Sequence, residues 1–115
     1  MNEIKLSQIK NDLKFLKNFN IVVYGSFLTD YYIPYRSDID IAIITFKLDK
    51  EKNINLWSSV IGKAPSCYDI RIFELLPLYI KIEIINNHYV LFGNELEISE
   101  YFYFIEKNGI MWKKE

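Results

Sequence analysis

The sequence IVVYGS at residues 21–26, followed by SDIDI at residues 37–41, decides the fold that we expect. The first segment is a short β-branched run that ends in a Gly-Ser pair, as a buried strand ending in a turn does. The second alternates acidic and aliphatic residues, which predicts a second strand whose polar face begins with Asp38 and Asp40. Both carboxylates are expected on one side of that strand, with Cα atoms about 6.6 Å apart.

Helical and extended patterns alternate along the rest of the chain. Helices are predicted at residues 6–16, 50–61 and 98–107, and further strands at residues 68–73 and 90–92. Residues 75–85 fit either periodicity, and Pro77 at the start with Asn86 at the end favours a helix. The pattern predicts an α/β (α+β) fold in one domain over residues 1–115, with a small mixed β-sheet flanked by helices.

Composition limits the classes of function. Half of the 115 residues are hydrophobic and 25% are charged, which is typical of one globular domain. The 14 basic and 15 acidic side chains give a net charge of -1. Sequence-independent binding of nucleic acid needs a basic surface, so a long RNA or DNA is not the expected ligand.

No apolar run approaches the roughly 20 residues that span a bilayer. Residues 1–10 lack the apolar core of a secretion signal, so a cytoplasmic location is expected. Cys67 is the single cysteine, which excludes an internal disulfide, and we expect it to be a small buried side chain. His88 is expected in a solvated turn.

The two segments quoted first carry the candidate chemistry. A pair of carboxylates from Asp38 and Asp40 offers the oxygen ligands that Mg²⁺ prefers. Gly25 lets the backbone approach a phosphate, and Ser26 adds a hydroxyl donor. Together they predict a metal site that faces a phosphate cradle.

Asp69 is the predicted third carboxylate. It lies between Tyr68 and Ile70 in an otherwise apolar strand, where an unpaired carboxylate is costly. If this strand lies beside the strand of Asp40, three carboxylates can hold two Mg²⁺ ions roughly 3.5 to 4 Å apart. Such a site suits in-line nucleotidyl transfer, in which Asp69 helps to activate the acceptor hydroxyl.

This combination of motifs resembles the DNA polymerase beta superfamily, and most closely its minimal nucleotidyltransferase (MNT) family. The later segments at residues 68–70, 76–78, 84–85 and 90–92 extend the resemblance over most of the chain. It implies that Gly25 and Ser26 contact the nucleoside triphosphate. It also implies that Asp38, Asp40 and Asp69 form the catalytic metal site.

The chain departs from the family pattern after Ser26. Many relatives continue with a small residue, an arginine and a glycine, whereas residues 27–30 here read FLTD. Arg36 is the nearest basic residue that can replace the missing charge. An ion pair between Arg36 and Asp30 is the alternative.

MNT proteins commonly pair with a HEPN-domain toxin, and some transfer AMP from ATP to a tyrosine of that toxin. The resemblance therefore implies a Mg²⁺-dependent protein adenylyltransferase that acts as an antitoxin. One alternative is a nucleotidyltransferase for a small molecule such as an aminoglycoside. Another is an inactive antitoxin that acts by binding alone.

Aromatic residues are concentrated near the C-terminus. The run Tyr101 to Phe104, with Met111 and Trp112, is more than one small sheet protein can readily bury. We therefore predict a homodimer or heteromer that uses this segment.

Overall fold

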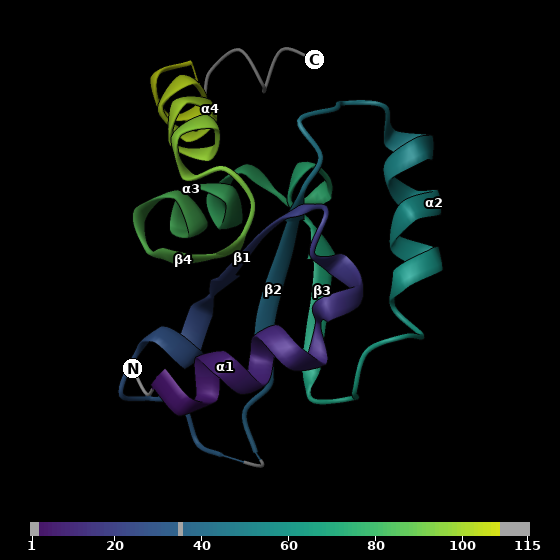
Figure 1. The fold of residues 1–115 in the computed structure, drawn as a ribbon. Coiled ribbons are helices and arrows are strands. Elements are labelled where there is room, and N and C mark those ends of the chain that lie inside the picture. The colour runs from purple at the N-terminus through teal and green to yellow at the C-terminus, as the bar shows by residue number, and fades with distance from the viewer. Residues whose placement is uncertain (1–2, 35, 109–115) are drawn as a thin grey trace.

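The computed structural model describes residues 3–34 and 36–108, and its centre is a four-stranded sheet (Figure 1). In chain order the helices and strands are α1 (Glu3–Asp12), β1 (Asn20–Tyr24), β2 (Ile39–Ile44), α2 (Lys50–Val60), β3 (Tyr68–Ile72), α3 (Leu78–Asn86), β4 (His88–Phe92) and α4 (Glu95–Lys107). The 3-10 turns η1 (Lys14–Leu16), η2 (Gly25–Leu28) and η3 (Phe73–Leu75) follow α1, β1 and β3. The predicted α+β fold is confirmed.

The strands lie in the order β3-β2-β1-β4. β1 is antiparallel to both β2 and β4, whereas β2 and β3 are parallel and are connected through α2. The registers place Tyr24 opposite Asp40, and Asp40 opposite Asp69. Three polar side chains therefore form a row across β1, β2 and β3.

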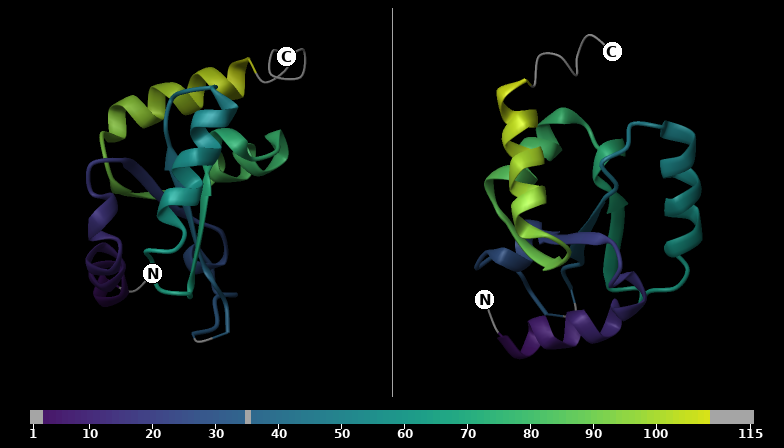
Figure 2. Two further views of the ribbon diagram at one scale, coloured as in Figure 1. Left: turned by 90° about the vertical axis from the view of Figure 1, so that its right-hand side faces the viewer. Right: turned by 45° about the horizontal axis from the view of Figure 1, so that its top comes forward.

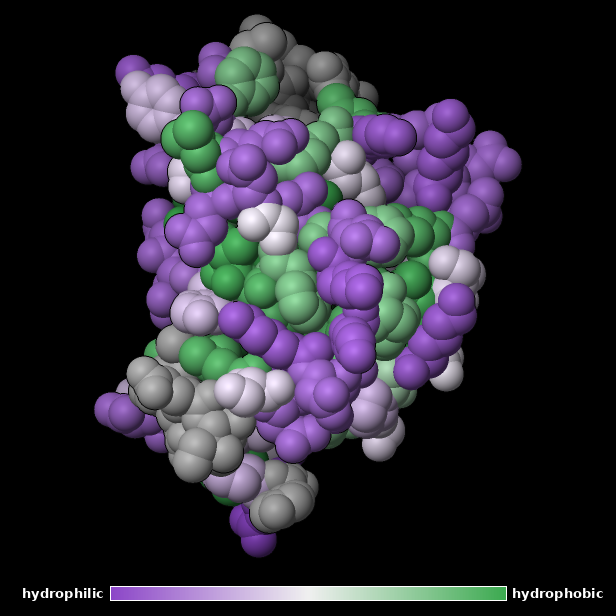
Figure 3. Space-filling view, viewed as in Figure 1, coloured by the Kyte–Doolittle hydropathy of each residue, from purple (hydrophilic) through white to green (hydrophobic). Residues whose placement is uncertain are grey.

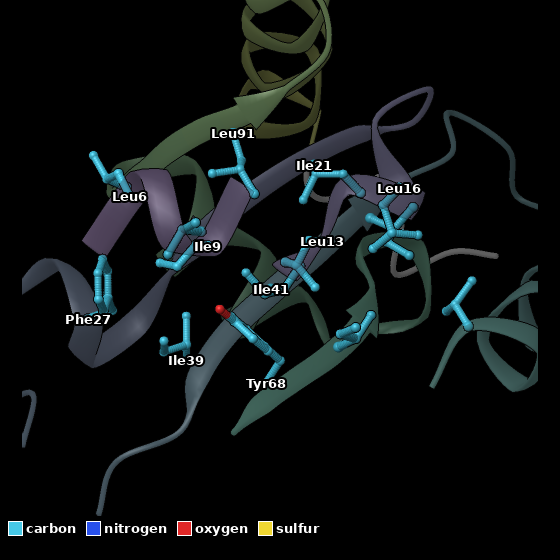
Figure 4. Close-up of a cluster of buried hydrophobic side chains, with 14 of the residues drawn as sticks. Leu6, Ile9, Leu13, Leu16, Ile21, Phe27, Ile39, Ile41, Tyr68 and Leu91 are labelled. Carbon is cyan, nitrogen blue, oxygen red and sulfur yellow. The ribbon is translucent and has the colours of Figure 1, made fainter. Parts of the chain in front are cut away.

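Hydrophobic residues fill both faces of the sheet. Figure 4 shows the first cluster, in which Leu6 and Ile9 of α1, with Leu13 just after it, pack over the strands. The second cluster joins the other face to η3, α3 and α4, and its buried members are Val22, Ala42, Ile44, Phe73, Ile84, Ile98, Phe102 and Ile105. Figure 2 shows α1 and α4 on opposite sides of the sheet.

Several element ends differ from the sequence-based predictions. α1 ends at Asp12, and residues up to Leu16 form the separate turn η1. α4 begins at Glu95, three residues before the predicted start, because the Asn94 side chain accepts a hydrogen bond from the Glu97 N–H at 2.9 Å. The helix preferred for residues 75–85 is confirmed by α3.

Two expectations for single residues are wrong. Cys67 is exposed, because it lies just before β3. His88 is partly buried at the start of β4, with its Nδ1 2.8 Å from the Ile84 carbonyl oxygen and its ring edge-on to Phe102.

The surface of the molecule is mostly polar on the side drawn in Figure 3, with apolar side chains near the middle of that view. Within residues 3–34 and 36–108, no helix has the length and apolar character needed to cross a membrane.

Candidate active site

Asp40 and Asp69 face one pocket near the end of β1 and the starts of β2 and β3. They are register partners on the parallel strands β2 and β3, and each lies on the face opposite to α1. The pocket has a volume of about 660 Å³ and is also lined by Tyr24 and Gly25. The strand of Asp69 thus lies beside the strand of Asp40, which is the condition for a shared carboxylate site.

The pocket has a negative electrostatic character. Burial raises the pKa of Asp40 to about 6, and the charges of Asp69 and Asp38 add to the increase, while Arg71 opposes it. Burial, Asp40 and Asp69 likewise raise the pKa of Tyr24 to about 12. A cation bound in this pocket would relieve the repulsion between the carboxylates.

Gly25 closes one side of the pocket with its backbone. Its φ is +75°, and a Cβ at this position would lie 2.3 Å from Oδ2 of Asp40. Only glycine combines this conformation with so close an approach. Ser26, the other residue predicted to contact a triphosphate, follows in η2 and does not line the pocket.

Asp38 and Arg36 lie elsewhere. β2 begins at Ile39, so Asp38 precedes the strand and the alternation of side chains does not fix its direction. Both residues line a second pocket of about 420 Å³, together with Asp12 and Tyr68. Their roles as metal ligand and phosphate ligand stay predictions.

Arg71 is a pocket residue that sequence reasoning missed. Its Nε donates to Oδ1 of Asp69 at 2.8 Å, which is the ion pair that the structure shows among the described residues. The expected alternative pair of Arg36 with Asp30 is not formed in that part of the chain. The signal in the sequence was the spacing of Asp69 and Arg71, two positions apart on one strand.

Polar residues of α3 complete the opposite wall. Tyr79, Glu83, Asn86 and Asn87 all line the pocket of Asp40. Tyr79, Glu83 and Asn86 lie on one face of α3, whereas Asn87 directly follows the helix. This spacing was available in the sequence.

The pocket suits a divalent cation in its chemistry. Mg²⁺ usually binds through one or two carboxylates together with substrate phosphates, and Asp40 and Asp69 supply two carboxylates. Within the described ranges, no three Asp, Glu, His or Cys side chains gather closely enough to hold a metal ion. The fit therefore rests on two assembled ligands, with Asp38 near enough to affect the pKa of Asp40.

Comparisons with known proteins point to one family. Residues 6–91 match the family described as nucleotidyltransferase domain. Over 91 residues the chain is 50% identical to a Methanocaldococcus jannaschii protein that bears the provisional name protein adenylyltransferase. This alignment covers 79% of the chain and 69% of the relative.

Two solved structures have a similar fold. A chain from a toxin–antitoxin crystal structure with AMP-PNP has a TM-score of 0.56 and 18% identity, covering 95% of this chain and 96% of its own. A chain from a structure of tri-AMPylated Shewanella oneidensis HEPN toxin with MNT antitoxin has a TM-score of 0.50 and 18% identity, covering 99% and 98%. At these identities the likeness concerns the fold.

Proposed function

The chain belongs to the nucleotidyltransferase domain family, and on this basis we propose that it is a Mg²⁺-dependent protein adenylyltransferase. The observation that carries the proposal is the pairing of Asp40 with Asp69 in one pocket beside Gly25. Nucleotidyl transfer uses such carboxylates to hold cations against phosphates. The provisional name of the M. jannaschii relative supports a protein as acceptor.

In this proposal, Asp38, Asp40 and Asp69 would hold two Mg²⁺ ions, and Gly25 and Ser26 would contact the triphosphate of ATP. When bound, Mg²⁺ neutralises the phosphates and the pyrophosphate leaving group. The carboxylates of Asp40 and Asp69 lie on adjacent strands of a sheet, so their positions are fixed before substrate binds.

The reaction moves AMP from ATP to a hydroxyl oxygen. The acceptor oxygen forms a bond to the α-phosphorus while the bond from that phosphorus to the pyrophosphate oxygen breaks, and pyrophosphate leaves with the bonding electrons. Asp69 accepts the proton of the acceptor hydroxyl in this scheme. Its position at the open side of the pocket supports this role, because its side chain is 36% exposed.

We propose a tyrosine of a HEPN-domain toxin as the acceptor, so that the chain acts as an antitoxin. The related fold in a complex of MNT antitoxin with AMPylated HEPN toxin supports this partner class. Tyr103 and Phe104 on the outer side of α4 are 61% and 52% exposed and offer an apolar surface for a partner.

Transfer of labelled AMP tests the proposal. The purified chain is incubated with Mg²⁺, ATP labelled at the α-phosphate and a purified HEPN-domain toxin, and label is expected on a tyrosine of the toxin. Asp40→Asn should abolish transfer. Label on an aminoglycoside in place of the partner would favour the small-molecule alternative, and tight binding without any label would favour an inactive antitoxin.

A further inference from the structure

The pocket of Asp40 has an unusual balance of charges for a site that receives a triphosphate. Its lining includes the carboxylates of Asp40, Asp69 and Glu83. Among its described lining residues, Arg71 is the only cation. Arg36, for which the sequence predicts a phosphate role, lines the other pocket.

Arg71 is held loosely in the structure. Its Nε contacts Oδ1 of Asp69 at 2.8 Å, but its Nη2 lies 3.5 Å from Oδ2, at the limit of a hydrogen bond. The side chains of Arg71 and Asp69 are 52% and 36% exposed. Exposed ion pairs add little to stability, so another anion can replace Asp69 at the guanidinium.

The position of Arg71 favours contact with a phosphate chain. Its register partner is Ala42, which is two residues beyond Asp40 on β2 and presents no charge of its own. The charge of Arg71 also reaches Asp40 and Tyr24 in the same pocket, since it opposes the increase in the pKa of both groups. A guanidinium presents a planar set of donors that matches phosphate oxygens.

We propose that Arg71 binds the phosphate chain of the nucleotide, and that Asp69 holds this arginine in the nucleotide-free protein. The inference rests on the proposed function and assigns Asp69 two successive partners. A cation on Asp69 competes with the guanidinium for the same carboxylate oxygens, which frees Arg71 for the phosphates.

Binding of inorganic tripolyphosphate in the presence of Mg²⁺ tests the phosphate contact, because this probe has no nucleoside and cannot donate AMP. We expect Arg71→Gln to bind it at least tenfold more weakly than the wild type, and Arg71→Lys to show an intermediate affinity because it keeps the charge. Lys63→Gln removes an exposed charge outside the pocket and should bind like the wild type.

Binding of Mn²⁺ without nucleotide, followed by electron paramagnetic resonance, tests the second half of the inference. Arg71→Gln should bind Mn²⁺ severalfold more tightly than the wild type, because Asp69 no longer has a competing partner. A merely structural role for Arg71 would weaken both Mn²⁺ and tripolyphosphate binding.

Three results would overturn the inference: no binding of tripolyphosphate by the wild type, equal affinity in Arg71→Gln, or loss of affinity in Arg36→Gln in place of Arg71→Gln. Failure of the proposed function has a different signature. In that case AMP transfer is absent, while tripolyphosphate binding that depends on Arg71 persists.

Discussion

The backbone of Gly25 lies against the carboxylate of Asp40, so that a Cβ at position 25 would lie 2.3 Å from Oδ2. The residue directly after β1 thus determines where the central carboxylate of the candidate site can lie. Tyr24, the register partner of Asp40, reinforces this arrangement from the same strand end.

Gly25→Ala is expected to reduce both stability and nucleotide binding. The added methyl group displaces the Asp40 side chain, and an alanine in this left-handed conformation costs about 1 kcal/mol before the clash is counted. Chemical denaturation and calorimetry measure the two effects. Gly62→Ala is the matched control, since a Cβ there meets nothing within 4 Å, and a comparable loss in this variant would contradict the steric explanation.

Asp40→Asn is expected to stabilise the metal-free protein at pH 7 by about 1 kcal/mol, after discounting the pKa shift for the solvent that reaches a half-buried group. Burial raises the pKa of Asp40 from 3.8 to about 6 on folding; the charges of Asp69 and Asp38 add to the increase, and Arg71 opposes it. Above pH 6 the folded wild type therefore carries a penalised charge, and below pH 4 the carboxyl is protonated in both folded and unfolded states.

The advantage of Asp40→Asn should therefore disappear as the pH falls from about 6 to about 4. Thermal unfolding over this range measures it. Asp30→Asn, at an exposed loop position, controls for the change in net charge. If Asp40→Asn is more stable than the wild type by the same amount at every pH, the difference in stability does not arise from titration of Asp40.

ATP is expected to bind at least tenfold more tightly in the presence of Mg²⁺ than in EDTA. Asp40 and Asp69 repel the triphosphate unless a cation lies between them and the phosphates. Calorimetric titration under both conditions gives the ratio. Equal affinities would rule out metal-bridged nucleotide binding.

Tyr101→Phe is expected to destabilise the protein by about 1.5 kcal/mol. The hydroxyl of Tyr101 donates to Glu74 at 2.8 Å, and the same carboxylate accepts the N–H groups of Thr45 and Phe46 at the end of β2. Phe46 has a φ of 60°, so this turn depends on Glu74 to fix it. Tyr103→Phe, on an exposed ring, should leave the melting temperature unchanged.

Phe104→Lys is expected to weaken association with a partner protein or a second copy by tenfold or more, as the aromatic run in the sequence predicts. Phe102 is buried against the sheet, whereas Phe104 is 52% exposed. Sedimentation of the chain alone and with its partner measures the effect. Met111 and Trp112, which contribute to the same prediction, lie outside the described residues.

The sequence predicts most of the fold because its strands have a clear period of two. The alternation around Asp40 and around Asp69 shows which residues share a face, and the Gly-Ser pair marks the end of β1. Placing these two strands side by side needed only the assumption of one small sheet. The structure bears this out in the register of Asp40 with Asp69.

The features that the sequence did not predict depend on the residue at which a helix or strand begins and on its tertiary contacts. Asp38 directly precedes β2, and the alternation of residues does not show at which residue a strand begins. The pairing of Arg71 with Asp69 and the polar face of α3 depend on tertiary placement. Cysteine is a residue type that is often buried, but Cys67 is exposed because it lies at the surface directly before β3.

The parallel pairing of β2 with β3 also determines how the site is lost. β3, which carries Asp69, is an edge strand. It follows β2 in the chain only after the crossover through α2. Edge elements open locally at a lower free energy than the centre of a sheet. Partial opening of β3 would separate Asp69 and Arg71 from Asp40, so we expect mild denaturant to weaken ligand binding before it unfolds the chain.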